Sequence, residues 1–140
     1  MALQSSEMTS SEKASVVSAA ADDKRAVDIV TLDIQGITLV ADFFVICSGT
    51  SDVHIRSISD GIEEALKKNH RVSPMAVQGR NEANWIILDY GDVVVHVFSE
   101  MERSYYDLEG FWQHARVVER VMAGRPGEHR DEPAAEPALP

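Results

Sequence analysis

The segment Ser48-Gly49-Thr50-Ser51 has the composition of a phosphate-binding turn. It stands between an apolar run and a predicted helix, where small residues can expose backbone donors to a phosphate at the helix N-terminus. Enzymes that transfer nucleotides combine such a turn with paired carboxylates that hold magnesium. No Asp-x-Asp or Asp-x-Glu follows in the next predicted strand, and neither a Walker motif nor GxGxxG is present. We therefore favour a tight structural turn and keep phosphate binding as the alternative.

Two carboxylates, Asp89 and Asp92, flank Tyr90-Gly91 in a predicted hairpin turn. Two acids on one loop could bind a cation or divide acid and base roles between them. Asp side chains more often build such turns by accepting local backbone hydrogen bonds. An exposed acidic tip could instead pair with Arg or Lys of a partner. Because no third acid and no base lies nearby in the sequence, catalysis is the weakest of the three interpretations.

The histidines and the single cysteine predict no metal site, and no cofactor is expected. No two histidines have the spacing that places both on one helical face. His96 falls on a mixed strand face, opposite an apolar valine face, so we favour a hydrogen-bonded, semi-buried histidine over an interface residue. Cys47 lies inside an apolar run, which favours a small core residue over a reactive thiol.

Hydrophobic spacing predicts the elements that position these residues. Capping-box spacing at 9–12 predicts a helix that ends near 24–25, and Ser51-Asp52 predicts a second helix that ends at 67–69. Capping-box spacing at 99–102 predicts a last helix, whose core-facing stripe would be Met101, Tyr105, Leu108 and Trp112. Alternating or continuous apolar runs predict strands at 27–33, 43–47, 74–79, 85–88 and 93–98.

This order of elements indicates an α/β fold with a mixed β-sheet flanked by helices. We expect a single domain over residues 9–122. A flexible leader, residues 1–8, would precede it. Residues 123–140 hold four of the five prolines and would form a disordered tail.

The charge of the chain restricts its partners. The net charge of −10 comes from 23 acidic and 13 basic side chains. An acidic surface repels phosphate backbones, so no direct nucleic-acid specificity is expected, whereas a basic protein partner suits it. The plain alternative is that acidity only keeps the chain soluble. The sequence shows no signal peptide and no apolar run of the roughly 18 residues that span a bilayer, so we expect a cytoplasmic location without a membrane anchor.

Three segments carry a resemblance to a known family. DIVTLDIQG, ADFFVICSGTSDVHIRSISDGIEEALKK and NWIILDYGDVVVHVFSEMERSYYDLEGFW occur in the order seen in ribosome silencing factors of the Iojap family. The chain resembles that family over about residues 12 to 114. It departs from the family pattern at Gln78-Gly79, where Glu-Gly is usual.

The resemblance implies a nucleotidyltransferase-like fold without catalytic carboxylates, and a translational repressor that is not an enzyme. Such a factor binds the large ribosomal subunit at its protein fourteen and sterically blocks joining of the small subunit. The resemblance also implies help in large-subunit assembly and homodimers off the ribosome. Two alternatives stay open: a magnesium-dependent enzyme using Ser48-Gly49 with Asp89 and Asp92, and a dimeric adaptor acting off the ribosome.

Within this interpretation, partner-binding residues are expected in the hairpin and at the start of the last helix. Seven of the nine aromatic residues of the chain fall between positions 85 and 112. Large aromatics with a polar group anchor protein interfaces when they are exposed. Acids of the hairpin would pair with basic groups of the ribosomal partner. The expected contact residues are Trp85, Asp89, Tyr90, Asp92, His96, Phe98, Arg103 and Tyr106.

Overall fold

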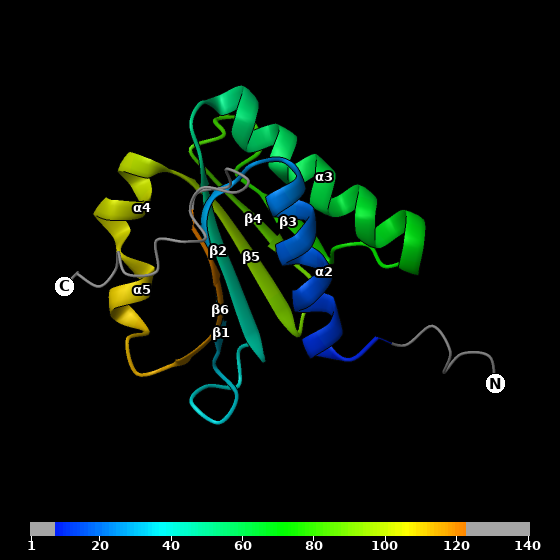
Figure 1. The fold of residues 1–140 in the computed structure, drawn as a ribbon, viewed down its shortest axis with the longest axis vertical. Helices are drawn as coiled ribbons and strands as arrows, with labels where there is room; N and C mark the ends of the chain where they lie inside the picture. The colour runs from blue at the N-terminus through cyan, green and yellow to red at the C-terminus, as the bar shows by residue number, and fades with distance from the viewer. Residues whose placement is uncertain (1–7, 123–140) are drawn as a thin grey trace.

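The computed structural model describes residues 8–122 and has a six-stranded sheet with helices on both faces (Figure 1). Helices α2 (Ser10–Asp23) and α3 (Asp52–His70) cover one face, and α4 (Glu100–Tyr106) and α5 (Leu108–Phe111) lie against the other. The strands are β1 (Val27–Asp33), β2 (Phe43–Gly49), β3 (Ala76–Gln78), β4 (Trp85–Asp89), β5 (Val93–Ser99) and β6 (Arg116–Val121). The predicted α/β fold with a mixed sheet flanked by helices is therefore confirmed.

The strand order across the sheet is β3-β4-β5-β2-β1-β6. Strands β2 and β5 pair in parallel, from Phe43 opposite Val93 to Gly49 opposite Ser99, and the other pairs are antiparallel. A parallel pair needs a long crossover, which α3 and the β3–β4 hairpin supply. Every residue of β2 is buried, because the strand is central and covered on both faces, as its continuous apolar run predicted.

Local hydrogen bonds fix both long helices. At the start of α2 the predicted capping box is present: Glu12 N donates to Thr9 Oγ1 and Thr9 N to Glu12 Oε1, each at 3.0 Å. Ser51 caps α3, as predicted. Helix α3 continues past 67–69, where its end was expected, and the left-handed residue is Arg71 rather than Asn69. The longer helix lets Val72 pack against the core.

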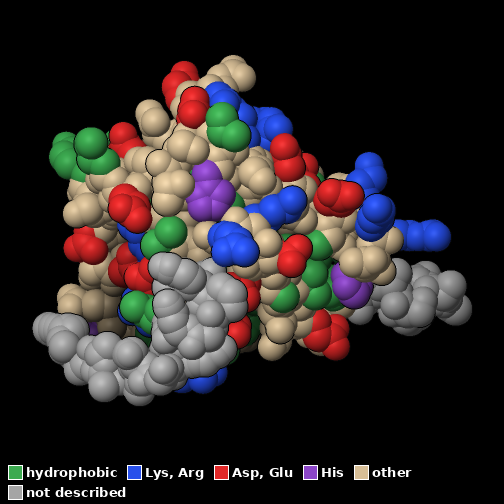
Figure 2. Space-filling model, turned by 45° about the horizontal axis from the view of Figure 1, so that its top comes forward, with side chains coloured by type: hydrophobic (Ala, Val, Ile, Leu, Met, Phe, Trp, Pro, Cys, Tyr) green, Lys and Arg blue, Asp and Glu red, His purple; other side chains and the backbone are tan. Residues whose placement is uncertain are grey.

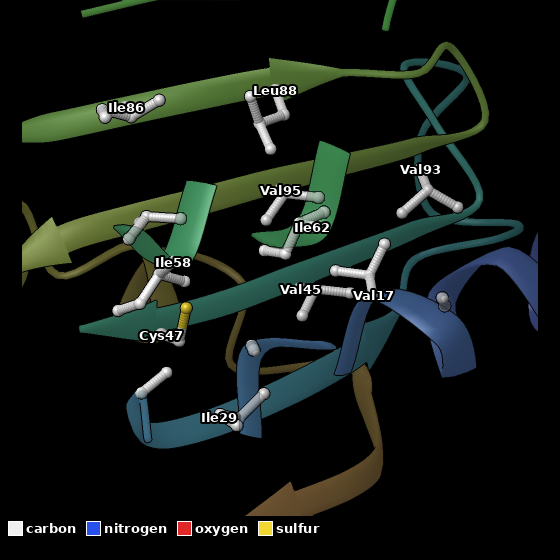
Figure 3. Close-up of a cluster of buried hydrophobic side chains, with 14 of the residues drawn as sticks. Val17, Ile29, Val45, Cys47, Ile58, Ile62, Ile86, Leu88, Val93 and Val95 are labelled. Carbon is white, nitrogen blue, oxygen red and sulfur yellow. The ribbon is translucent and has the colours of Figure 1, made fainter. Parts of the chain in front are cut away.

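The main core lies between the sheet and helices α2 and α3. Figure 3 shows side chains of α2 and α3, among them Val17, Ile58 and Ile62, directed onto valines, isoleucine and leucine of the strands. The predicted apolar face of α3, at positions 55, 58, 62 and 66, is buried. Cys47 belongs to the same cluster and is fully buried, which confirms the prediction of a core residue. Burial raises the pKa of its thiol to about 12.

The prediction of one continuous last helix is wrong. Asp107 takes a left-handed conformation with φ of 46°, so α4 ends there, and the Asp107 side chain caps α5 by accepting from Gly110 N. The break changes which side chains face the core. Met101 and Tyr105, predicted on the core-facing stripe, are exposed, whereas Leu108 and Trp112 pack against the second apolar cluster on the α4–α5 face of the sheet.

Strand β6 was not predicted from the sequence. It pairs antiparallel with β1 at the sheet edge, and its residues are exposed except for the half-buried Val121. A strand exposed on both faces lacks the alternation that marks a half-buried strand, so no pattern indicated it.

The expected leader and tail fall almost entirely outside the described residues. Of the leader, only Met8 is described, and it packs against the main core. Within residues 8–122 no helix has the length and apolar character needed to cross a membrane.

Candidate partner-binding surface

An aromatic pair, Trp85 and Tyr106, forms the part of the predicted contact set that reaches solvent as apolar surface. Trp85 begins β4 opposite Phe98 of β5, and its ring stacks on Phe98 at a centroid distance of 4.7 Å. Tyr106, at the end of α4, lies 4.7 Å from the Trp85 ring and remains 48% exposed. Strand register and the C-terminus of α4 therefore place these two rings together. We call Trp85 and Tyr106 the aromatic surface.

His96 lies beside Trp85, on the neighbouring strand β5. Because Phe98 and His96 are two residues apart on β5, both lie on the sheet face that carries Trp85. The indole Nε1 of Trp85 donates to His96 Nδ1 at 3.1 Å. The imidazole is 6% exposed, and burial lowers its pKa to about 4. The prediction of a hydrogen-bonded histidine is confirmed, although the side chain is more deeply buried than expected.

The two hairpin acids make bonds within the chain. Asp89 Oδ1 accepts from Gly91 N at 2.8 Å, in a turn where Gly91 has φ of 90°. This confirms the turn-building interpretation for Asp89. Asp92 Oδ1 accepts from Lys13 Nζ of α2, also at 2.8 Å. Across residues 8–122 there is no group of three His, Cys, Asp or Glu side chains that could hold a metal ion.

Two aromatic residues of the expected contact set lie inside the molecule. Tyr90 is 5% exposed and Phe98 is fully buried. Tyr90 follows the end of β4 and packs into the main core, and burial raises the pKa of its phenol. Phe98 fills the second cluster under Trp85. Their positions beside a turn and at a strand end did not distinguish buried from exposed aromatics. Phe98 supports the aromatic surface from below, whereas Tyr90 belongs to the core on the opposite face of the sheet.

Arg103 links α4 to α5, β2 and β1 rather than facing solvent. Its side chain is 11% exposed and makes two bonds to Glu109 of α5, from Nε to Oε1 and from Nη2 to Oε2, both at 3.0 Å. Its Nη1 donates to Ser48 Oγ of β2 at 2.9 Å. Burial alone would raise the pKa of Glu109, but the hydrogen bonds and charge of Arg103 outweigh it and hold that pKa below its usual value.

Polar groups of the turn from Ser48 to Ser51 are bonded within the chain, chiefly to His54 of α3. Thr50 N donates to His54 Nδ1 at 2.9 Å, and Ser51 Oγ accepts from His54 N at 3.1 Å. A Cβ added to Gly49 would lie 2.7 Å from Ile55 Cγ1, so the glycine is needed for close packing against α3. These contacts favour the structural turn over the phosphate-binding alternative.

Sequence reasoning missed the partners of these residues. Lys13 stands 79 positions from Asp92, and no local pattern links the two. Glu109 reaches Arg103 only because the helix breaks at Asp107.

Figure 2 shows acidic and basic side chains interspersed on the face in view, and hydrophobic side chains protruding on the left, the side of α4 in Figure 1.

Comparisons with known proteins agree with one another. The family model described as RsfS, "Ribosomal silencing factor during starvation", matches residues 7–138. The chain is 46% identical over 104 residues to the ribosomal silencing factor RsfS of Bacillus subtilis (strain 168), covering 74% of this chain and 87% of that protein. It is 35% identical over 94 residues to the mitochondrial Iojap-related protein of Arabidopsis thaliana, and the match covers 64% of this chain and 50% of that protein. An X-ray crystal structure of a Chromobacterium violaceum protein matches with a TM-score of 0.73 at 28% identity, covering 76% of this chain and 88% of that one.

Proposed function

The chain belongs to the ribosomal silencing factor family, and on that premise we propose that it represses translation by binding the large ribosomal subunit and blocking its joining with the small subunit. The family match over residues 7–138 supports a ribosome-associated silencing role, and it confirms the resemblance seen in the sequence. The proposed mechanism is occupancy: a rigid body on the joining face excludes the small subunit, and no catalytic group takes part.

One structural observation carries the proposed contact: the aromatic surface stands on a rigid buried layer. Trp85 is held by Phe98 and His96, and Tyr106 packs against its other side while half exposed. Aromatic side chains that are already ordered lose little freedom on binding, and Trp and Tyr are enriched among the residues that dominate interface energies. The proposed partner is protein fourteen of the large subunit. The acidity of the chain, −10 in net charge, favours encounter with a basic partner.

The other expected contact residues differ in how far they can meet a partner. Asp89 uses one oxygen for Gly91, and its second oxygen makes no hydrogen bond to the rest of residues 8–122, so it is the acid best placed to meet a basic group. Asp92 and Arg103 are paired inside the chain. His96 and Phe98 are buried and support the surface, whereas Tyr90 is buried on the opposite face of the sheet and takes no part in it. The proposal also places the chain in the cytoplasm and includes self-association off the ribosome.

Co-sedimentation with purified large subunits in a sucrose gradient tests the proposal, with subunit joining measured in parallel. Tyr106→Ala and Trp85→Ala should each weaken binding by about 2 kcal/mol, roughly thirtyfold, as expected for central aromatic anchors. Val53→Ser is the matched control, because Val53 is an exposed apolar residue on α3, which covers the opposite face of the sheet.

The outcomes separate the alternatives. Wild-type protein that binds large subunits and inhibits joining, with both properties lost in the two aromatic variants, supports the proposal. Wild-type protein that stays at the top of the gradient refutes it and favours an adaptor acting off the ribosome. Binding that is equally strong in all four proteins would remove Trp85 and Tyr106 from the interface.

A further inference from the structure

The indole of Trp85 is restrained on three sides. Its Nε1–H donates to His96 Nδ1 at 3.1 Å. Phe98 stacks against its ring with an interplanar angle of 28°, and Tyr106 covers it at 43°. Of these three contacts only the hydrogen bond fixes the direction in which the ring points, because stacked rings can slide and turn on one another.

This bond determines the protonation of His96. The indole nitrogen can only donate, so Nδ1 must accept and the imidazole proton resides on Nε2. Nε2 is buried and has no hydrogen-bond partner within the described part of the chain. The ring instead meets Phe44 edge-on, with centroids 4.9 Å apart at 68°. Among residues 8–122 this buried N–H therefore has no oxygen or nitrogen acceptor.

A buried polar atom without a partner destabilises the fold, and an apolar side chain at position 96 would avoid that cost. The surroundings would accept one, because Phe44, Phe98 and Trp85 all lie within ring-contact distance of the imidazole. What an apolar residue could not supply is the acceptor at Nδ1. The position of the acceptor, rather than packing, explains a histidine here.

We infer that His96 is a positioning residue that fixes the Trp85 indole in the orientation in which the chain meets its partner. The inference rests on the proposed function and deepens it, since Trp85 belongs to the aromatic surface and His96 itself has no access to a partner. A ring that is fixed before binding need not be immobilised during binding. Removing the acceptor should therefore weaken large-subunit binding by roughly three- to tenfold, the cost of ordering one side chain.

Two substitutions at position 96 separate the acceptor from the ring. His96→Phe keeps a flat ring among Phe44, Phe98 and Trp85 but removes the acceptor. His96→Asn removes the ring but can place its Oδ1 near the position of Nδ1, so it should restore the bond to Trp85. We expect weaker binding for His96→Phe and near wild-type binding for His96→Asn. His96→Leu gives the same test as His96→Phe if the larger ring prevents folding.

The closing experiment combines binding with nuclear magnetic resonance of the free protein. Dissociation constants for purified large subunits are measured for these variants in the wild-type background and in a Trp85→Phe background. The ¹⁵N relaxation of the Trp85 indole N–H reports its mobility, and ¹⁵N shifts of His96 report the tautomer. We expect a rigid indole and an Nε2–H tautomer in the wild type, a mobile indole in His96→Phe, and no effect of His96→Phe once Trp85 is Phe.

Two results would overturn the inference. One is an indole that stays rigid, with unchanged binding, in His96→Phe. The other is an equal loss of binding in the Trp85→Phe background, which would mean that His96 acts on the fold and not through Trp85. Failure of the wild type to bind large subunits refutes the proposed function instead, and the relaxation measurement still decides whether His96 orients the ring.

Discussion

Lowering the pH from 7 to 5 should destabilise the protein through the imidazole of His96. Burial lowers the pKa of this side chain to about 4, from an ordinary value of 6.5. Between these two values the unfolded chain binds a proton that the folded protein does not, so acidification favours unfolding. The stabilising effect is fully present above pH 6.5 and is lost as the pH falls towards 4.

The size of the effect follows from the difference between the two pKa values. One unit of pKa difference corresponds to about 1.4 kcal/mol. The free energy of unfolding should therefore fall by about 2 kcal/mol between pH 7 and pH 5, and by about 3 kcal/mol by pH 4. Glu109 and Asp33, whose pKa values are lowered from 4.5 and 3.8, add losses in the same direction mainly below about pH 5. A comparison at pH 5 thus reports mainly on His96.

Urea unfolding followed by circular dichroism at pH 7 and pH 5 measures this loss. His96→Asn provides the matched variant, because it removes the titrating group while it can retain an acceptor for Trp85. The wild type should lose about 2 kcal/mol between the two pH values, and the variant markedly less. Equal losses in both proteins would show that other groups cause the pH dependence, and the assignment to His96 would be refuted.

Three further predictions concern stability and reactivity. Glu109→Gln should lower the free energy of unfolding by about 2 kcal/mol, because it removes the carboxylate that binds the largely buried guanidinium of Arg103 and leaves it only one carboxylate contact, the longer one to Asp28, 3.7 Å from Nη2. Gly49→Ala should destabilise the protein by about 1–3 kcal/mol, because the added methyl group would clash with Ile55 of α3. Gly61→Ala should stabilise it by about 0.5–1 kcal/mol, because it replaces a glycine inside α3 and the added methyl group meets only the flexible side chain of Lys24. Cys47 should resist a thiol reagent at pH 8 in the folded protein and react once urea unfolds it, because the thiol is buried.

Controls for these measurements come from the same chain. Glu119→Gln removes an acid from the exposed edge strand β6 and should leave stability nearly unchanged. A loss in Glu119→Gln as large as that in Glu109→Gln would argue for a general charge effect. Opposite signs for the two glycine variants would support close packing at Gly49, and equal signs would contradict it. Labelling of Cys47 at the same rate in folded and unfolded protein would disprove its burial.

The sequence predicted those elements whose pattern is local. The helix caps at Thr9 and Ser51 and the strand from Val27 to Asp33 are found where the spacing of polar and apolar residues placed them. These features depend on neighbours in the chain, so periodicity and capping chemistry suffice to find them. The fold class followed from their order.

What the sequence did not predict depends on contacts between distant segments. Met101 and Tyr105 do lie in a helix, as their spacing predicted. The left-handed conformation of Asp107 ends that helix, and both side chains are exposed. The burial of Tyr90 depends on packing against the core from α3 and β5. The bond between Trp85 and His96 needs the register of two strands, which the sequence indicates only approximately.

The strand order has a consequence for how the protein is made. Strand β1 is paired on its outer side by β6, and β2 pairs on one side with β5, both of which are translated much later. During synthesis from the N-terminus, α2 is available to cover one face of β1 and β2, but their opposite apolar face stays uncovered until α4 and α5 have left the ribosome. Such long-range pairing slows folding and populates aggregation-prone intermediates that expose hydrophobic surface. Truncation before α4 should thus leave this face exposed and lead to aggregation rather than to a smaller folded domain.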